Sequence, residues 1–482
     1  MQKKFLSNLG LLLLLNLLIK PIWIFGIDRN VQNLVGSAEY GFYFPLLNFT
    51  FLFYIILDFG ITNFNNRNIA QHNQLLKKHF SNLFVLKVLL GILYFVIIFV
   101  FAVLWGYRGR QLHFLIWLAL NQFLLSFILY LRSNISGLLL FKTESVLSVT
   151  DRVLMIFFCA VLIWGHIVPG PFKIEWFVYV QTISYLITAL LAMVIVMRKA
   201  SFSRFSWDWP FSLMIIKKSL PFALLVLIMY FQYRIDSVML LRLLPGIPGQ
   251  QQAGIYASAF RLLDAAVMPS YLFSILLLPI FSKQIREQLS VEQILKLSST
   301  MIILFATATA VFCASYSHEL MALLYKEHVN ESANLFPVLM YCLVPISLTY
   351  IFGTLVTARG KLMALSLVAA ISMVMNVLLN LILIPTYQAY GSAVSSLISQ
   401  SFFALGQIAL AQYYFRFKLN KKYLLRIALF LAGLFAISIA IKYTSVRWSL
   451  GFIGGLFLVV VWAASLNLLD IRGLFSILRK PE

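Results

Sequence analysis

The sequence has little charge, and acidic residues are the scarcest kind. Only 16 of the 482 residues are Asp or Glu, against 38 Lys or Arg, and charged residues make up 11% of a chain that is 61% hydrophobic. A soluble globular domain carries about 25% charged residues, so this composition excludes an ordinary soluble protein. The basic residues lie in short loops between apolar runs, which indicates membrane topology and no nucleic-acid partner.

Sequence motifs for metal binding and for catalysis are also missing. The three cysteines, Cys159, Cys313 and Cys342, lie in or beside apolar runs without the spacing of a disulfide framework or a zinc site. No HExxH pair and no Walker sequence occurs. We therefore predict no metal site, no bound cofactor, no catalytic residues and no ATP hydrolysis by the chain itself.

What the chain does contain is long apolar runs. About 20 apolar residues are needed to cross the hydrocarbon core of a membrane, and runs of this length predict an all-α polytopic protein with about fourteen transmembrane helices. The predicted spans are about 6–27, 40–64, 80–105, 112–139, 147–168, 176–197, 217–243, 253–281, 297–317, 334–357, 362–384, 391–415, 424–442 and 449–469. With the N-terminus in the cytoplasm, inner segments hold about 24 Lys and Arg and outer segments about 8, so both termini are predicted inside.

One short motif occurs twice. GSAEYGFY, Gly36 to Tyr43, and GQQQAGIY, Gly249 to Tyr256, share the frame Gly-x4-Gly-x-Tyr, 213 positions apart. Lys20 and Arg234 precede the two copies by 16 and 15 residues, which match after one single-residue shift. This favours a parallel internal repeat over chance similarity among Leu-rich helices. We expect each motif to form the outer turn between the first two helices of a half, with Gly supplying the turn geometry and Tyr anchoring at the membrane interface.

The repeat predicts two pseudo-symmetric six-helix lobes. The first lobe is predicted at 1–200 and the second at 217–418, separated by an interfacial linker at 201–216 that mixes aromatic and basic residues. Helices 13 and 14, with a cytoplasmic tail, occupy 419–482 and resemble a scaffold or walls for a lipid tail. Two bundles of this kind are a common transporter plan.

Charged side chains inside the spans are the candidate functional residues, because a charge at membrane depth costs several kcal/mol and normally faces a bundle interior or a wet cavity. Cations outnumber carboxylates there by about six to four. We predict that Lys20, Arg132, Arg234 and Arg261 line a cavity that accepts an anionic headgroup. The alternative is that Arg234 and Asp236 neutralise Asp264 and Arg261 in a buried ion-pair set that only fixes packing.

Other polar residues in the spans have two interpretations each. The amides of Gln232, Asn376 and Asn380 either bind sugar hydroxyls or hold membrane helices together. Lys87 and the Asp151-Arg152 pair, placed nearer the inner surface, are interpreted as snorkelling side chains.

Three runs resemble a known family: LVGSAEYGFYFPLLNFTFLFYIILDFGI (34–61), SLPFALLVLIMYFQYRIDSVML (219–240) and NVLLNLILIPTYQAYGSAVSSLISQ (376–400). They are similar to polysaccharide and O-antigen lipid flippases of the multidrug, oligosaccharidyl-lipid and polysaccharide exporter superfamily. The resemblance implies two six-helix lobes plus two further helices, a cationic central cavity, and translocation of an undecaprenyl-pyrophosphate-linked oligosaccharide across a bacterial inner membrane.

Individual positions take roles from this resemblance. Arg29, Asp58, Asp236 and the stretch 376–391 stand where the family pattern has recurring residues. The resemblance thus adds Arg29 to the predicted pyrophosphate site. Lys20-Pro21 departs from the apolar first helix of the family.

The resulting prediction is a flippase, not an enzyme, that works by alternating access in the synthesis of O-antigen or another surface polysaccharide. Proton or sodium coupling through Asp58, Asp236 or Asp264 is part of this hypothesis, and the expected partners are membrane lipid and the polymerase and glycosyltransferases of the same pathway. The rivals are a cation-coupled multidrug exporter, a membrane glycosyltransferase or polymerase, and a scaffold without transport.

Overall fold

The described part of the chain is helical. The computed structural model describes residues 18–62, 75–138, 140–165, 170–200, 208–417, 420–444 and 446–469, together with residues 15, 65, 66 and 69. Among these residues there is no strand, and eleven helices are long and apolar enough to cross a membrane. The predicted all-α polytopic fold is confirmed.

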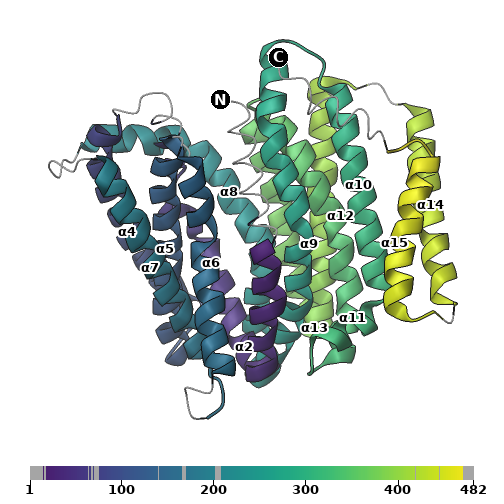
Figure 1. The fold of residues 1–482 in the computed structure, drawn as a ribbon, viewed down its shortest axis with the longest axis horizontal. Helices are drawn as coiled ribbons and strands as arrows, with labels where there is room; N and C mark the ends of the chain where they lie inside the picture. Colours follow the sequence, from purple (N-terminus) through teal and green to yellow (C-terminus); the bar gives the residue numbers. More distant parts are fainter. Residues whose placement is uncertain are drawn as a thin grey trace. The chain divides into compact units, whose positions relative to one another are not determined.

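Contacts divide the chain into two compact units, Met1–Gly254 and Ile255–Glu482 (Figure 1). The helices of the first unit are η1 (Ile22–Asp28), α2 (Arg29–Leu52), η2 (Tyr54–Leu57), α4 (Leu75–Leu104), α5 (Arg110–Gly137), α6 (Phe141–Trp164), α7 (Ile174–Ala200) and α8 (Trp209–Leu243). Helix α9 (Ile247–Arg286) begins in the first unit and continues into the second. The second unit also contains α10 (Glu292–Ser315), α11 (Ser317–Leu324), α12 (Val329–Ala358), α13 (Leu362–Phe415), α14 (Lys421–Lys442) and α15 (Trp448–Ser465).

The first unit extends beyond the end of the predicted first lobe. Helix α8, predicted to open the second lobe at 217, belongs to the first unit because α2 packs along it. The linker predicted at 201–216 lies largely outside the described residues, and the division into lobes stays a prediction.

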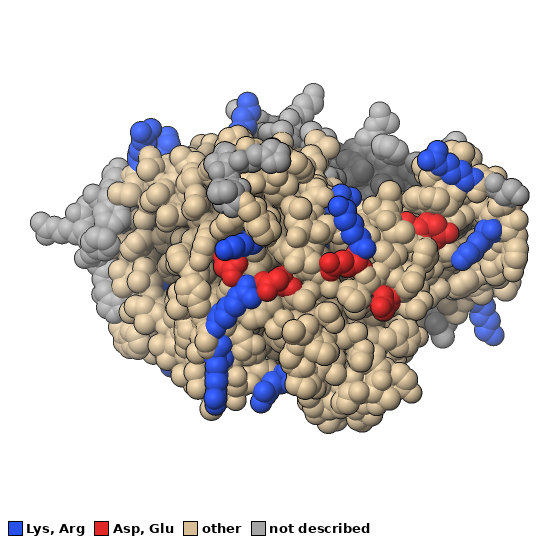
Figure 2. Space-filling model, turned by 90° about the horizontal axis from the view of Figure 1, so that it is seen from below, with Lys and Arg blue, Asp and Glu red and all other residues tan. Residues whose placement is uncertain are grey.

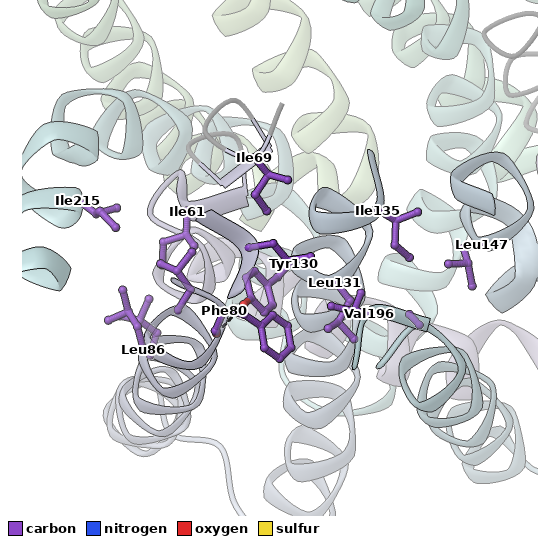
Figure 3. Packing of buried hydrophobic residues seen from close by; sticks show 14 residues of the cluster. Ile61, Ile69, Phe80, Leu86, Tyr130, Leu131, Ile135, Leu147, Val196 and Ile215 are labelled. Carbon is purple, nitrogen blue, oxygen red and sulfur yellow. Dashed lines mark hydrogen bonds between the residues drawn. The ribbon is translucent and has the colours of Figure 1, made fainter. Parts of the chain in front are cut away.

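Buried side chains from five helices form the core of the first unit (Figure 3). Tyr130 of α5 and Phe80 of α4 lie at its centre, with their rings stacked at 6.1 Å and 16°. The Tyr130 hydroxyl donates to the carbonyl of Phe80 at 3.0 Å, which satisfies the only polar atom of a fully buried side chain. On the opposite side of α4, apolar residues such as Ile92 and Val96 are more than half exposed. A helix that is apolar on every face is expected where one face meets the protein core and the other meets lipid.

Residues from three predicted outer connections meet on one side of the first unit. Arg110, at the start of α5, forms ion pairs with Glu39 of α2 at 2.7 Å and with Glu175 of α7 at 2.8 Å. This arrangement agrees with the alternation of spans expected from the sequence. On the face shown in Figure 2, several acidic and basic side chains lie close to one another among uncharged surface.

Helix α13 is a hairpin. Its 54 residues are interrupted at Gln388, which has φ 53° and ψ −132°. Ser372 donates to the carbonyl of Ser399 at 2.7 Å, so the segments before and after Gln388 run back along each other. These segments correspond to two predicted spans, 362–384 and 391–415.

The repeated glycine motif forms a close helix crossing in the first unit. A Cβ built on Gly41 of α2 would overlap the carbonyl of Gln250, and would lie 2.5 Å from the nitrogen of Gly254. A Cβ built on Gly254 would overlap the carbonyl of Ser37. Because Ser37 and Gln250 hold the same position in the two copies of the motif, the contact is reciprocal. Gln32 adds a hydrogen bond to the Gly254 carbonyl at 3.0 Å.

Two details of the predicted motif are wrong. Gly36 does interrupt α2 with φ 83°, but Gly249 is helical, and the turn between α8 and α9 falls at Gly246, with φ 73°. Tyr43 and Tyr256 are not interfacial anchors, since each is only 1% exposed. Gln181 donates to the Tyr43 hydroxyl at 3.1 Å, so this ring has a polar partner in the protein interior.

Helices α14 and α15 pack together and against α10 (Figure 1). Phe312 of α10, Phe430 of α14 and Val459 of α15 belong to one buried cluster. Trp462 donates to the carbonyl of Leu429 at 3.3 Å and covers Gly433. Each of these two helices therefore packs through one face, while apolar residues on its other faces are exposed.

Candidate functional site

The second predicted span is broken at Asp58. Helix α2 ends at Leu52, the short helix η2 follows, and Phe59 and Gly60 both have positive φ. A break in a membrane-spanning helix leaves backbone groups without their helical partners, and these must be satisfied inside the protein. Thr62 donates from its backbone and its hydroxyl to the Asp58 carboxylate, which caps the chain after the break.

Lys87 of α4 supplies the remaining partners at this break. Its ammonium forms an ion pair with Asp58 and donates to the carbonyl of Leu57 at 2.9 Å and to the hydroxyl of Ser126 at 3.1 Å. The side chain is 2% exposed, so the interpretation of Lys87 as a snorkelling residue is wrong. No pattern in the sequence predicts the break, which places the Asp58 carboxylate and the Leu57 carbonyl beside the buried ammonium.

A cluster of charges surrounds the beginning of the first described helix in the same unit. Lys20 is half-buried, precedes Pro21 and the π-helix η1, and lies within electrostatic range of Arg152, Asp151 and Arg132. Arg132 of α5 forms an ion pair with Glu144 of α6 at 2.6 Å.

Asp151 and Arg152 occupy neighbouring positions on α6, with 3.7 Å between the Arg152 Nε and an Asp151 oxygen. The Arg152 guanidinium lies 5.5 Å from the ring centre of Trp23 in η1, a cation–π arrangement. We call Lys20, Arg132, Glu144, Asp151 and Arg152 the Lys20 cluster. Three cations and two carboxylates thus come from three helical segments.

Arg234 lies among different partners on α8. It donates to the Asn48 side-chain oxygen at 3.3 Å, and Asn48 in turn donates to the Ser237 hydroxyl at 2.8 Å. The guanidinium lies 5.2 Å from the ring centre of Phe51 and 5.0 Å from that of Tyr233. Contact with two rings restricts the orientation of the planar group.

Of the other predicted residues in this unit, Gln232 and Asp236 of α8 are buried, and Arg29 lies at the junction of η1 and α2. Gln232 and Asp236 are each 1% exposed. Arg29 begins α2, is half-buried, and donates to the side chain of Asn30 at 2.9 Å. Sequence reasoning missed Asp28, which is 3% exposed and accepts a hydrogen bond from the Tyr40 hydroxyl at 2.9 Å. Asp28 and Tyr40 are twelve residues apart with the interruption of α2 between them, so helical periodicity does not predict their contact.

In the second unit, Arg261 and Asp264 are half-buried and three residues apart on α9. Asn376 and Asn380 are both fully buried in the α13 hairpin. Asn380 donates to the Asn376 oxygen at 3.0 Å, and Asn376 donates to the Ser399 hydroxyl at 3.1 Å. These contacts join the two segments of the hairpin, as amides between membrane helices commonly do.

Of the five predicted cations, the Lys20 cluster brings together Lys20 and Arg132. It also includes Glu144, which the sequence analysis missed because α6 begins at Phe141, about two turns before the predicted start of that span. Among the described residues no group of three or more His, Cys, Asp or Glu side chains could hold a metal ion.

Comparison with known proteins places the chain in a family. The model of the family described as "Polysaccharide biosynthesis protein" matches residues 5–285, more than half of the chain. The chain therefore belongs to this family, and the resemblance noted in the sequence is confirmed. No curated protein sequence matches the chain closely enough to count as a relative.

Solved structures with the same fold are transporters. A structure of the lipid II flippase MurJ in an inward closed conformation is 13% identical, with a TM-score of 0.70 over 96% of this chain and 99% of that one. An inward-facing multidrug resistance MATE family transporter of the MOP superfamily is 17% identical, with a TM-score of 0.64 over 84% of this chain and 94% of that one. A MOP superfamily transporter from Pyrococcus furiosus, whose binding pocket is described as having reverse polarity, is 16% identical, with a TM-score of 0.56. At these identities the likeness establishes the fold.

Proposed function

We propose that the chain is a flippase that moves an undecaprenyl-pyrophosphate-linked oligosaccharide, the repeat unit of O-antigen or another surface polysaccharide, across the bacterial inner membrane. The observation that carries the proposal is the Lys20 cluster of a polysaccharide biosynthesis family member, in which Lys20 lies within electrostatic range of Arg132, Asp151 and Arg152, and Arg132 pairs with Glu144. A cation among apolar helices is costly unless an anion or water accompanies it.

The chemistry of the cluster suits a pyrophosphate. Arg132 and Arg152 carry planar guanidinium groups, which donate paired hydrogen bonds to phosphate oxygens, while Lys20 adds a mobile point charge. Arg29, Arg234 and Arg261 complete the proposed path for the anionic headgroup. Of the two roles predicted for Asn376 and Asn380, the joining of helices is favoured, because both amides are fully buried and hydrogen-bonded within the α13 hairpin.

The mechanism we propose is alternating access, with the two predicted lobes as the moving parts and both termini in the cytoplasm. The chain has no Walker sequence, so the coupling energy in this proposal comes from a proton or sodium gradient acting on Asp236 or Asp264. Asp58 is a weaker candidate than the sequence suggested, because the ammonium of Lys87 already neutralises it. The polymerase and glycosyltransferases of the same pathway would consume and supply the substrate.

One alternative has support from the comparisons, since a multidrug resistance MATE transporter shares the fold. Both kinds of transporter would need a coupling carboxylate, so the Asp58–Lys87 pair does not separate them. The cations of the Lys20 cluster favour an anionic headgroup over a cationic drug.

The test is a cell whose surface polysaccharide depends on this gene. Lys20→Gln, and separately the double change Arg234→Gln with Arg261→Gln, should lower surface glycan about tenfold or more, as expected when a charged hydrogen-bond partner worth about 1.5–3 kcal/mol is lost. Lys283→Gln, an exposed cation at the end of α9, is the matched control and should leave glycan unchanged. Protein level in the membrane is measured in each strain. Normal glycan in both sets of variants, together with raised drug susceptibility, would contradict the flippase and favour the exporter.

A further inference from the structure

A basic pocket lies in the second unit, away from every residue assigned above. It has a volume of about 430 Å³ and lies at the start of α10, the start of α14 and the end of α15. The side chains that matter here are Lys296 and Thr300 of α10, and Asn420, Lys422, Tyr423 and Arg426 at the beginning of α14. Positive charge in the loops places this end of the helices on the predicted cytoplasmic side.

The charge of the pocket is of one sign. Lys296, Lys422 and Arg426 line it, and no carboxylate does so among the described residues. Lys422 and Arg426 are four residues apart, so they share one face of α14 and repel each other. The first turn of α14 contains no acidic residue, although the positive end of the helix dipole favours anions there and disfavours cations. A bound anion would offset both unfavourable terms.

Neutral groups hold the pocket wall in place. The hydroxyls of Thr300 and Tyr423 are hydrogen-bonded at 2.7 Å, joining α10 to α14. The Lys296 ammonium lies 5.2 Å from the ring centre of Tyr423. Asn420 caps α14 by accepting from the backbone of Tyr423 at 3.1 Å, which leaves the backbone N–H groups of the two preceding residues as further donors at the helix start.

We propose that this pocket binds a phosphate group through Lys296, Lys422 and Arg426. Its volume exceeds that of one phosphate, so the ligand carries a further small polar group such as glycerol or a sugar. Two sources offer this chemistry: the headgroup of an anionic lipid of the inner leaflet, and a soluble phosphate compound in the cytoplasm. Basic pockets between helices at this membrane surface are typical sites for anionic headgroups. The lipid source fits the exposed Leu425 and Leu429 on the same helix, which offer a path for an acyl chain.

The experiment uses the full-length protein, with Lys422→Gln and Arg426→Gln combined as the test variant. The control is Lys283→Gln with Arg286→Gln, which removes the same amount of charge from exposed positions on α9. In the lipid arm, retention of phosphatidylglycerol against phosphatidylcholine is measured by native mass spectrometry. In the soluble arm, inorganic phosphate and glycerol 3-phosphate are titrated by thermal shift in zwitterionic detergent.

Each lost cation is expected to weaken binding about fivefold, as for a basic residue near an anionic membrane surface, so the test variant should bind roughly 25-fold more weakly than the control. A loss confined to phosphatidylglycerol identifies the lipid source, and a loss confined to the soluble compounds identifies the cytoplasmic source. Equal binding by the test and control variants in both arms overturns the proposal. Thermal stability without ligand separates lost binding from misfolding: the test variant should be at least as stable as the control, because it removes a repulsion between two exposed side chains at the start of α14. Surface glycan production is not the readout, so the outcome is independent of the proposed flippase activity.

Discussion

The reciprocal crossing of Gly41 and Gly254 predicts that neither position tolerates even a methyl group. In Gly41→Ala the added Cβ would overlap the Gln250 carbonyl and lie 2.5 Å from the nitrogen of Gly254. In Gly254→Ala it would overlap the Ser37 carbonyl. The obstructing atoms belong to backbone, so no side-chain rotation relieves the clash, and the two helices must move apart.

The size of the effect follows from two opposed terms. Overpacking of this kind costs about 1–3 kcal/mol, whereas replacing Gly by Ala in a helix gains about 1 kcal/mol. Because the added Cβ meets backbone atoms, the upper end of the overpacking range applies, and the balance is a destabilisation of roughly 2 kcal/mol for either change. This lowers the Tm of a unit of this size by about 4–8 °C. Because both methyl groups separate the same pair of helices, the double variant should lose less stability than the sum of the single variants.

The assay is thermal unfolding of the purified protein, followed by intrinsic fluorescence or by loss of monodisperse elution. Gly454→Ala is the matched control, since Gly454 is helical and nothing lies within 4 Å of the added Cβ. This control should keep or slightly raise the Tm. A wild-type Tm for Gly41→Ala and Gly254→Ala, or a fully additive double variant, would refute the close crossing and with it the contact between the two copies of the motif.

Three further predictions concern buried polar groups and backbone strain. Lys87→Met leaves the Asp58 carboxylate and the Leu57 carbonyl without their partner and should lower the free energy of unfolding by about 3–5 kcal/mol, measured as loss of folded protein on extraction. Adding Asp58→Leu should restore part of the folded protein. No recovery would mean that Lys87 does not stabilise the protein through its pair with Asp58. Asn376→Ala removes a buried amide of the α13 hairpin and should lower stability by about 1–3 kcal/mol in thermal unfolding, whereas an unchanged Tm would indicate that the amide does not join the hairpin. Gln388→Gly should raise stability by about 1–2 kcal/mol, because a side chain at φ 53° is strained, and a lower Tm would count against that backbone conformation.

Much of the fold could be predicted because membrane spans depend on length and apolar composition alone. The runs at 112–139 and 176–197 correspond closely to α5 and α7. The repeat was also visible, since glycines at fixed distances from a cation and a Tyr are hard to obtain by chance. The structural role of the repeat could not be predicted, because a close helix crossing and a tight turn both require glycine. Only the structure shows that Gly254 lies at a crossing and Gly246 at a turn.

The charged residues were found by sequence but their partners were not. A charge inside an apolar run identifies Lys20, Lys87 or Arg132 as a residue that needs a partner. Which partner it has depends on helix rotation and on breaks such as the one before Asp58, and neither leaves a periodic signal. A helix start misplaced by two turns was enough to hide Glu144, the ion-pair partner of Arg132.

The most direct test of the proposed activity is flipping of a lipid-linked oligosaccharide by the purified protein in proteoliposomes. Substrate exposed on the outer surface is measured over time with a membrane-impermeant reagent, for the wild type, Lys20→Gln and the control Lys283→Gln. We expect rapid exchange of the undecaprenyl-pyrophosphate-linked substrate for the wild type and the control, about tenfold or more slower exchange for Lys20→Gln, and no exchange of a lipid-linked sugar without phosphate. Exchange at the rate of empty liposomes in the wild type, or equal rates with and without the pyrophosphate, would contradict the account.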